Sequence, residues 1–407
     1  MTDVLNSSRR SDADQAGEDL STAGLSEELA DLAAMVRDFA RTVVAPAAVT
    51  HDAAHTFPYE VVAQMGELGL FGLPVPEEYG GMGGDHTALC VAIEELARVD
   101  QSIAITLEAG VSLGISPLLH YGTEEQKAAW VPDLAAGRAL AGFGLTEPEA
   151  GSDASGTRTT ARLEDGQWVI NGSKEFITNS GTDITRLVTV TAVTGTGVDR
   201  KGKERKEIST LLVPVPTEGF RAEKAYDKVG WNSSDTHPLT LTDVRVPEAN
   251  LLGERGRGYA NFVHTLDEGR IAIAALGTGA AQGCLDASVR YAKERHAFGS
   301  AIGHHQAIAF KIARMQVRVH TARLAWRDAA ARMVAGKPFK TQASIAKIVA
   351  GEAAMDNARD ATQIFGGYGF INEFVVARHY RDSKILEIGE GTTEVQQMLI
   401  ARSLGLE

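Results

Sequence analysis

The sequence predicts a mixed α and β protein of several domains, and three observations support this prediction. A length of 407 residues is enough for two or three domains. The spacing of hydrophobic residues changes from a helical period of 3.6 to a strand period of 2 at about Gly142, and it returns to 3.6 from Tyr259. No strand pattern interrupts the later helical segments, which argues against the βαβ alternation of a doubly wound parallel sheet.

The order of these patterns divides the chain into four parts. We expect a flexible tail at 1–24, an all-α domain at 25–141, a β-domain at 142–256 and a helical bundle at 257–407. The tail is rich in Ser, Asp, Ala and Gly and has few large apolar residues. Long helices joined by short loops favour an antiparallel bundle. The expected bundle helices cover 259–291, 304–335, 341–365 and 394–403.

Helix start and stop signals mark the all-α part. The first expected helix begins after Ser26, an N-cap residue type, and ends at Ala45 because Pro46 follows. Thr123 and Gln126 have the spacing of a capping box. The other helical patterns cover 58–68, 87–99, 102–119 and 124–134.

The middle third reads as strands. The dipeptide Asn171-Gly172 lies between two alternating segments, which predicts a β-hairpin with a type I′ turn there. Further strands are expected at 187–193, 208–215 and 239–246. The charged, glycine-containing segment 195–207 is typical of a solvated hairpin tip, and we assign it no function.

Composition excludes several classes of function. Lys and Arg number 40 against 53 Asp and Glu, so the net charge of −13 has the wrong sign for nucleic-acid binding. Cys90 and Cys284 lie in apolar helical patterns, so we expect buried packing residues in a reducing compartment and no metal site. The sequence shows neither an apolar run long enough to span a membrane nor a signal peptide. We therefore expect a cytoplasmic protein without a membrane span.

Two glycine motifs need interpretation. Gly277, Gly279 and Gly283 have the spacing GxGxxxG rather than GxGxxG and follow no strand, so we expect close helix packing and not a dinucleotide fingerprint. The segment Gly366-Gly367-Tyr368-Gly369 follows a helical pattern. Its composition alone favours a structural turn, although three glycines also allow a backbone to approach a ligand.

Four separated segments contain residues that could take part in catalysis or ligand binding. They are Phe143–Asp153 (FGLTEPEAGSD), Lys174–Asn179 (KEFITN), Arg295–Phe298 (RHAF) followed by His305-Gln306, and Ile388–Val395 (IGEGTTEV). In order and spacing, these segments resemble the acyl-CoA dehydrogenase family over residues 26–405. The resemblance implies a helical N-terminal domain, a central β-barrel-like domain and a C-terminal four-helix bundle, which agrees with the order predicted from periodicity.

The resemblance also implies an FAD cofactor held between the β-domain, the bundle and a neighbouring subunit. It places the flavin ring against the β-domain segments, and the pyrophosphate and adenine against the bundle segments. An Arg fork suits a pyrophosphate. The implied FAD-binding residues are Phe143, Leu145, Thr146, Gly151, Ser152, Phe176, Ile177, Thr178, Arg295, Phe298, Gln306, Gln363, Gly366, Gly367, Thr392 and Glu394. The Gly366 loop then becomes a cofactor element.

The implied reaction is α,β-dehydrogenation of an acyl-CoA, with Glu390 taking the α-proton and flavin N5 accepting the β-hydride. Burial in a dry pocket would raise the pKa of such a carboxyl toward the working range. Some family branches carry the base where this chain has Gly269. Glu268 is one residue early, about 100° around a helix, so we favour Glu390. The implied acyl-CoA contacts are Ser152, Asp267, Arg270, Gly389 and Gly391.

Substrate class and partners follow from the same resemblance. The resemblance implies a short, medium or branched acyl group. Gly389 stands where many short- and medium-chain members carry Tyr, which predicts a more open roof of the acyl pocket and allows a branched or bulkier acyl group. The implied partners are an electron-transfer flavoprotein and further copies of the chain in a homotetramer, a dimer of dimers. One alternative is an acyl-CoA oxidase that lets oxygen reach the reduced flavin. Another is a DNA-binding relative, which the charge of −13 and the lack of a basic C-terminal extension argue against.

Overall fold

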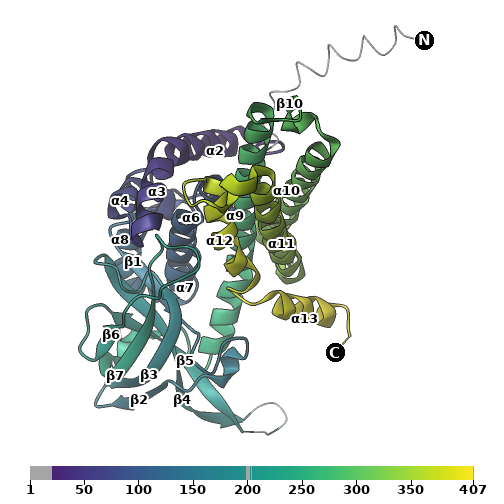
Figure 1. Ribbon diagram of the computed structural model, residues 1–407. Helices are drawn as coiled ribbons and strands as arrows, with labels where there is room; N and C mark the ends of the chain where they lie inside the picture. Colours follow the sequence, from purple (N-terminus) through teal and green to yellow (C-terminus); the bar gives the residue numbers. More distant parts are fainter. Residues whose placement is uncertain (1–20, 199–201, 203, 407) are drawn as a thin grey trace.

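The computed structural model describes residues 21–198, 202 and 204–406. Figure 1 shows the strands grouped at the lower left, the N-terminal helices above them, and the long C-terminal helices to the right. The predicted mixed α and β class, with helices, then strands, then helices, is confirmed. Residues 1–20 of the expected tail lie outside the described residues. Residues 21–24 form a turn, in which Ser21 is buried and its carbonyl accepts a hydrogen bond from Arg327, so this part of the tail is packed.

The first helix begins as its sequence predicts but does not end there. Helix α2 (Glu27–Phe39) starts at Ser26, whose hydroxyl accepts a hydrogen bond from the Leu29 N–H. The expected end before Pro46 is wrong, because a π-helical turn, η1 (Ala40–Val44), leads directly into α3 (Ala45–Ala54). Pro46 lies in the first turn of α3, where its missing N–H is not needed. The following elements are α4 (Tyr59–Glu67), α5 (His86–Ala97), α6 (Gln101–Glu108), η4 (Ala109–Ile115), α7 (Ser116–Tyr121) and α8 (Glu124–Ala135), which carries the predicted capping box.

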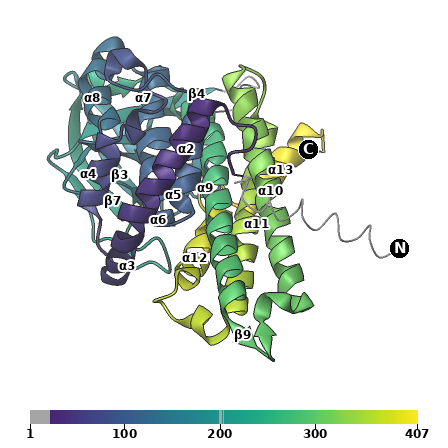
Figure 2. The ribbon, with the colours of Figure 1, turned by 90° about the horizontal axis from the view of Figure 1, so that it is seen from above.

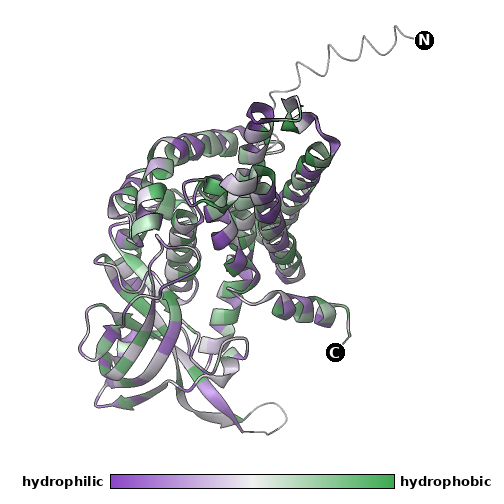
Figure 3. Ribbon diagram, viewed as in Figure 1, coloured by the Kyte–Doolittle hydropathy of each residue, from purple (hydrophilic) through white to green (hydrophobic). Residues whose placement is uncertain are grey.

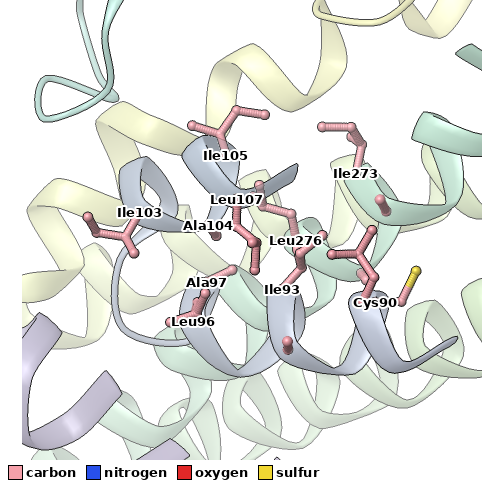
Figure 4. Close-up of a cluster of buried hydrophobic side chains, with 14 of the residues drawn as sticks. Cys90, Ile93, Leu96, Ala97, Ile103, Ala104, Ile105, Leu107, Ile273 and Leu276 are labelled. Carbon is pink, nitrogen blue, oxygen red and sulfur yellow. The ribbon is translucent and has the colours of Figure 1, made fainter. Parts of the chain in front are cut away.

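Elements α6, η4 and α7 form one helical run from Gln101 to Tyr121. By length and composition this run is apolar enough to cross a membrane, which differs from the sequence-based expectation. Its most apolar window is 83% buried inside the protein, and core helices of water-soluble proteins have the same composition. Figure 4 shows side chains of α6 among those of α5 and α9, including Ile93, Leu107 and Leu276. The buried cysteines Cys90 and Cys284 are free thiols, as expected, and burial raises the pKa of both.

One sheet forms the middle part, with strand order β6-β7-β3-β2-β4-β5-β8 and with β1 paired parallel to β4. The predicted turn at Asn171-Gly172 is wrong, because both residues lie inside β3, which pairs with β7 along its length. The Asn171 side chain exchanges two 2.9 Å hydrogen bonds with Asp243, beside a bulge. The hairpin turn is at Asp165-Gly166, where both residues have positive φ. The strands are β1 (Leu140–Gly144), β2 (Thr160–Glu164), β3 (Gln167–Thr178), β4 (Thr185–Val198), β5 (Glu204–Pro214), β6 (Phe220–Ala222), β7 (Thr236–Pro247) and β8 (Leu251–Leu252).

The C-terminal part is built around α9 (Gly258–Glu294), which packs against α5, α10 (Gln306–Val334) and α11 (Lys340–Phe365). Figure 2 shows α9, α10 and α11 running side by side. A Cβ atom on Gly277 would lie 2.9 Å from the Ala350 carbonyl oxygen, and one on Gly279 would lie 2.1 Å from that of Glu94. These glycines therefore allow helices to pack closely, as predicted.

The chain ends with three further elements. They are the 3₁₀ segment η8 (Gly366–Phe370), α12 (Val375–Ser383) and α13 (Thr393–Ser403), and a fourth, short 3₁₀ segment, η9 (Lys384–Glu387), joins α12 to α13. Helix α13 projects from the body of the molecule and carries both hydrophilic and hydrophobic residues (Figures 1 and 3). Of its residues only Gln396 is buried.

Candidate active site

Glu390 occupies a tight loop between η9 and α13. Its φ of 53° lies in the left-handed region, and Gly391 follows with a φ of 94°. Two buried side chains hold this loop. Lys347 Nζ donates to the Gly391 carbonyl oxygen at 2.8 Å, and Gln396 Nε2 donates to the same oxygen at 2.9 Å. Thr392 caps α13 by accepting a hydrogen bond from the Val395 N–H. The backbone conformation that aims Glu390 is thus fixed from both sides.

The Glu390 carboxyl points to the first third of α9. A Cβ atom on Gly269 would lie 2.6 Å from Glu390 Oε2, so the carboxyl reaches the surface of that helix only because residue 269 has no side chain. Glu390 Oε2 has no hydrogen-bond partner among the described residues. Burial raises the pKa of Glu390 to about 7, while the neighbouring Glu108 carboxyl and the charges of Lys347 and Arg270 oppose that rise. A carboxyl with this pKa can take a proton at neutral pH.

A second carboxyl, Glu108 at the end of α6, lies against Glu390. Its side chain is fully buried, and both of its oxygens lack a partner that meets hydrogen-bond geometry among the described residues. Burial first, and then the neighbouring Glu390 carboxyl, raise the pKa of Glu108 well above its usual range. Glu108 is therefore the neutral member of this pair, since two adjacent carboxylates do not ionise together.

The cationic side of the site consists of Arg270 and Lys347. Arg270 donates to the Asp267 carboxylate, and Lys340 lies 3.4 Å from the other oxygen of Asp267. Burial lowers the pKa of Lys347 to about 8. The structure thus brings Asp267, Arg270, Glu390 and Gly391 together, as the sequence predicts for the substrate site.

Glu268, the rival carboxylate, faces another part of the protein. It is buried and accepts a hydrogen bond of 3.0 Å from His120 Nε2. Burial favours its neutral form, but the hydrogen bond from His120 and nearby histidines hold the pKa of Glu268 below its usual value. This arrangement suits a structural ion pair better than a base.

The predicted flavin-facing residues form one group on the β-domain. Phe143 and Leu145 are buried in a small cluster with Phe262, on which the Phe143 ring stacks at 3.9 Å between centroids. The Glu175 N–H donates to the Thr146 carbonyl oxygen at 2.9 Å, which joins the loop after β1 to β3. Gly151 and Ser152 are exposed, and Ile177 is buried. Phe176 is 66% exposed and has a positive φ, so its ring is presented to the outside.

The remaining predicted FAD residues form a second group at the far end of α9. Arg295 and the Gly366-Gly367 backbone line a cavity of 510 Å³ together with Tyr291, Ile302 and Phe365. Phe298 is 97% exposed. Gln306 and Gln363 are exposed as well. Glu394 is also exposed, but it lies in the first turn of α13, beside the Glu390 loop, and so does not belong to this group. The Arg295 side chain makes no ion pair or hydrogen bond with any described residue, so it is available to an external anion.

One chain does not bring these two groups together. Phe262 packs on the β-domain group near the start of α9, and Arg295 follows its last residue. At 1.5 Å per residue the intervening helix is about 50 Å long, more than one dinucleotide spans. A single cofactor can therefore contact both kinds of segment only if they come from two copies of the chain.

Comparison with known proteins assigns the chain. Three family models match it in succession: the acyl-CoA dehydrogenase N-terminal domain at 26–138, the middle domain at 142–244 and the C-terminal domain at 256–405. The chain belongs to the acyl-CoA dehydrogenase family. It is 48% identical over 371 residues to the probable acyl-CoA dehydrogenase YngJ of Bacillus subtilis, covering 91% of this chain and 96% of that protein.

Solved structures agree with this assignment. Butyryl-CoA dehydrogenase from Megasphaera elsdenii has a TM-score of 0.89 at 40% identity, covering 94% of this chain and 99% of that one. The same four values apply to a chain from the structure described as the electron transferring flavoprotein of Acidaminococcus fermentans. A glutaryl-CoA dehydrogenase from Mycobacterium smegmatis in complex with FADH2 has a TM-score of 0.88 at 30% identity, covering 94% and 96%. The predicted family, enzyme class and flavin cofactor are confirmed.

The open features of this acyl-CoA dehydrogenase fit a flavin cofactor. The Phe176 and Phe298 rings are exposed although each has one ring neighbour, Tyr226 and His305 respectively. The Arg295 guanidinium makes no hydrogen bond or ion pair with the described residues. Aromatic rings and a guanidinium are groups that bind aromatic rings and phosphates. A side chain on Gly366 or Gly367 would meet nothing within 4 Å, so these glycines serve no internal packing contact.

Sequence reasoning missed Glu108, Lys347 and Gln396. Each is a polar residue in an otherwise apolar helical pattern, and that signal alone does not say which distant segment it faces.

Proposed function

We propose that Glu390 is the catalytic base of this acyl-CoA dehydrogenase. The observation that carries the proposal is the Glu390 carboxyl itself: its Oε2 atom is buried and unpartnered, and its pKa is raised to about 7. The carboxylate would take the α-proton of the acyl thioester. The Glu390 N–H, which makes no hydrogen bond within the described residues, is free to donate to the thioester oxygen, where negative charge develops.

FAD, when bound, supplies the acceptor for the β-hydride. We propose that Phe143, Leu145, Thr146, Gly151, Ser152, Phe176, Ile177 and Thr178 hold its flavin side, with Thr392 and Glu394 nearby. A second copy of the chain would contribute Arg295, Phe298, Gln306, Gln363, Gly366 and Gly367. The separation of these groups along α9 supports a dimer as the smallest functional unit. The projecting helix α13 supports further contacts in a homotetramer.

We propose a short, medium or branched acyl-CoA as the substrate, with Ser152, Asp267, Arg270, Gly389 and Gly391 in contact with it. A Cβ atom on Gly389 would come no closer than 3.5 Å to any neighbour, so packing does not require glycine there. The space left by the missing side chain is then available to the acyl group. Butyryl-CoA dehydrogenase among the solved relatives supports the short end of this range.

Further parts of the proposal concern context. Electrons would pass to an electron-transfer flavoprotein. The two free, buried cysteines support a cytoplasmic location without a membrane span. Domain limits at 25–141, 142–256 and 257–407 remain part of the proposal; the start of α9 at Gly258 supports the last limit, whereas the limit at 141/142 falls within β1.

The test is an anaerobic titration of the purified protein with straight and branched acyl-CoAs, followed by flavin absorbance. We expect prompt bleaching by one subset, which also names the substrate class. A flavin-containing protein that no acyl-CoA bleaches would contradict the proposal. Peroxide release in air that matches enoyl-CoA formation would instead identify an oxidase.

A further inference from the structure

The loop after β1 contains a buried ion pair that the reaction does not use. Lys174 in β3 is 0% exposed and Glu147 is 5% exposed, and Lys174 Nζ lies 2.7 Å from Glu147 Oε1. Both belong to segments singled out in the sequence, yet neither points to the proposed substrate position around Glu390. An ion pair this deeply buried has a large desolvation cost, so its role needs an explanation.

The hydrogen bonds of Glu147 hold one loop in place. The Glu147 carboxylate accepts from the Thr157 hydroxyl at 3.0 Å, the Arg158 N–H at 2.6 Å and the Thr159 N–H at 3.1 Å. Glu147 therefore joins the two ends of the segment 147–159, which contains Gly151 and Ser152. Burial alone would raise the pKa of Glu147, but Lys174 and these donors hold it down to about 2.

Lys174 connects that loop to three strands. Its ammonium donates to Glu147, to the Leu145 carbonyl oxygen at 3.3 Å and to the Thr191 hydroxyl oxygen at 3.0 Å. The Thr191 hydroxyl in turn donates to the Gly144 carbonyl oxygen at 3.3 Å. The end of β1, the loop, β3 and β4 thus meet at one ammonium group.

We propose that the Glu147–Lys174 pair is a positioning element for the cofactor: it holds the Leu145–Ser152 loop against β3 so that both can contact the flavin together. This inference rests on the proposed FAD site. The two segments joined by the pair are the two that carry the flavin-facing residues, and residues 174 and 176 are only two apart on β3. Replacing Glu147 leaves a buried cation without its partner, which destabilises a fold strongly.

The experiment must therefore separate stability from cofactor binding. In the double variant Glu147→Gln/Lys174→Met no buried charge remains unpaired, so we expect a melting temperature close to that of the parent. The hydrogen bonds to Leu145 and Thr191 are still lost. We expect FAD to leave the diluted holoenzyme about tenfold faster or more, measured by the appearance of flavin fluorescence.

A matched control is the buried pair Glu94–Arg323 in the helical core, where Arg323 Nε donates to Glu94 at 2.7 Å. Glu94→Gln should lower the melting temperature and leave FAD release unchanged. If the double variant has the same melting temperature as the parent and also releases FAD at the same rate, the proposal is wrong.

If the double variant does not fold, Thr191→Val removes one partner of Lys174 and should still speed FAD release; unchanged release would overturn the proposal. Failure of the parent to bind FAD would instead contradict the proposed function.

Discussion

Two glutamates in this enzyme, the buried Glu147 and the half-buried Glu390, have opposite surroundings. Glu147 has a lysine, a hydroxyl and two backbone N–H groups directed at its carboxylate, and its pKa is lowered to about 2. Glu390 has one oxygen without a partner, and its pKa is raised to about 7. The comparison shows that burial alone decides neither role. The number of donors that reach the carboxylate decides whether it stays charged and structural or remains able to exchange a proton.

Removal of the exchangeable carboxyl should have the largest effect. Glu390→Gln keeps the size of the side chain but cannot accept the α-proton, so we expect a loss of about 10² to 10⁴ in the rate of flavin reduction by acyl-CoA, with FAD retained. Stopped-flow absorbance measures this rate. Glu268→Gln is the control and should stay near the parent rate. The opposite pattern would make Glu268 the base.

Crowding the same carboxyl should have the next largest effect. In Gly269→Ala the new Cβ would lie 2.6 Å from Glu390 Oε2, so the carboxyl must move. Misplacement of a reacting group by about 1 Å costs on the order of 10²-fold in rate. Gly197→Ala is the control, since its Cβ would meet nothing within 4 Å and the residue belongs to none of the proposed binding sites. Equal rates for both variants would show that Glu390 does not need its position beside α9.

Removal of the neighbouring cation should change the pH dependence. The rate of flavin reduction should rise with pH through about 7, because Glu390 must be ionised to accept a proton. The positive charge of Lys347 lowers the pKa of Glu390, so Lys347→Met should move the midpoint of this profile to higher pH. Lys347→Arg keeps the charge and should move it less. A midpoint that does not change in Lys347→Met would mean that Lys347 only holds the loop.

The smallest effect on the maximal rate is expected at Glu108, whose neutral carboxyl lies beside that of Glu390 and lowers its pKa. Glu108→Ala removes this neighbour, so the pKa of Glu390 should rise and the pH midpoint should move up, at least as far as in Lys347→Met, because Glu108 lowers the pKa of Glu390 more than Lys347 does. Glu108→Gln keeps a donor and should stay close to the parent profile. A downward shift in Glu108→Ala would indicate that Glu108 is ionised and repels Glu390.

Local signals predicted much of the fold. Ser26 and the Thr123/Gln126 capping box begin helices as expected, because capping depends on residues three positions apart. The prediction of a turn at Asn171-Gly172 was wrong because pairing with β7, about 70 residues later, extends β3 through both residues. A π-helical turn carries the first helix past the expected stop at Pro46.

The candidate site likewise contains residues that the sequence could predict and residues that it could not. Glu390 and Arg270 could be proposed from motifs read along the chain. Glu108 and Lys347 could not, because their importance depends on a contact with a loop 43 or more positions away. The same holds for Glu147, whose partner Lys174 was visible in another motif but whose bonds to it were not. Motifs in the sequence identify the reacting group, and long-range packing brings together the residues that set its pKa and position.

The length of α9 determines how damage in one chain would affect the two cofactor sites of a dimer. In the proposed dimer each chain gives its base to one cofactor site and its Arg295 end to the other, about 50 Å away. A defective copy with an intact fold would then damage its partner's site as well as depend on it. A dimer of one chain with a defective base and one chain with a defective Arg295 end would contain one site with both defects and one site with neither. Such a pair of harmful changes would then be milder together than alone.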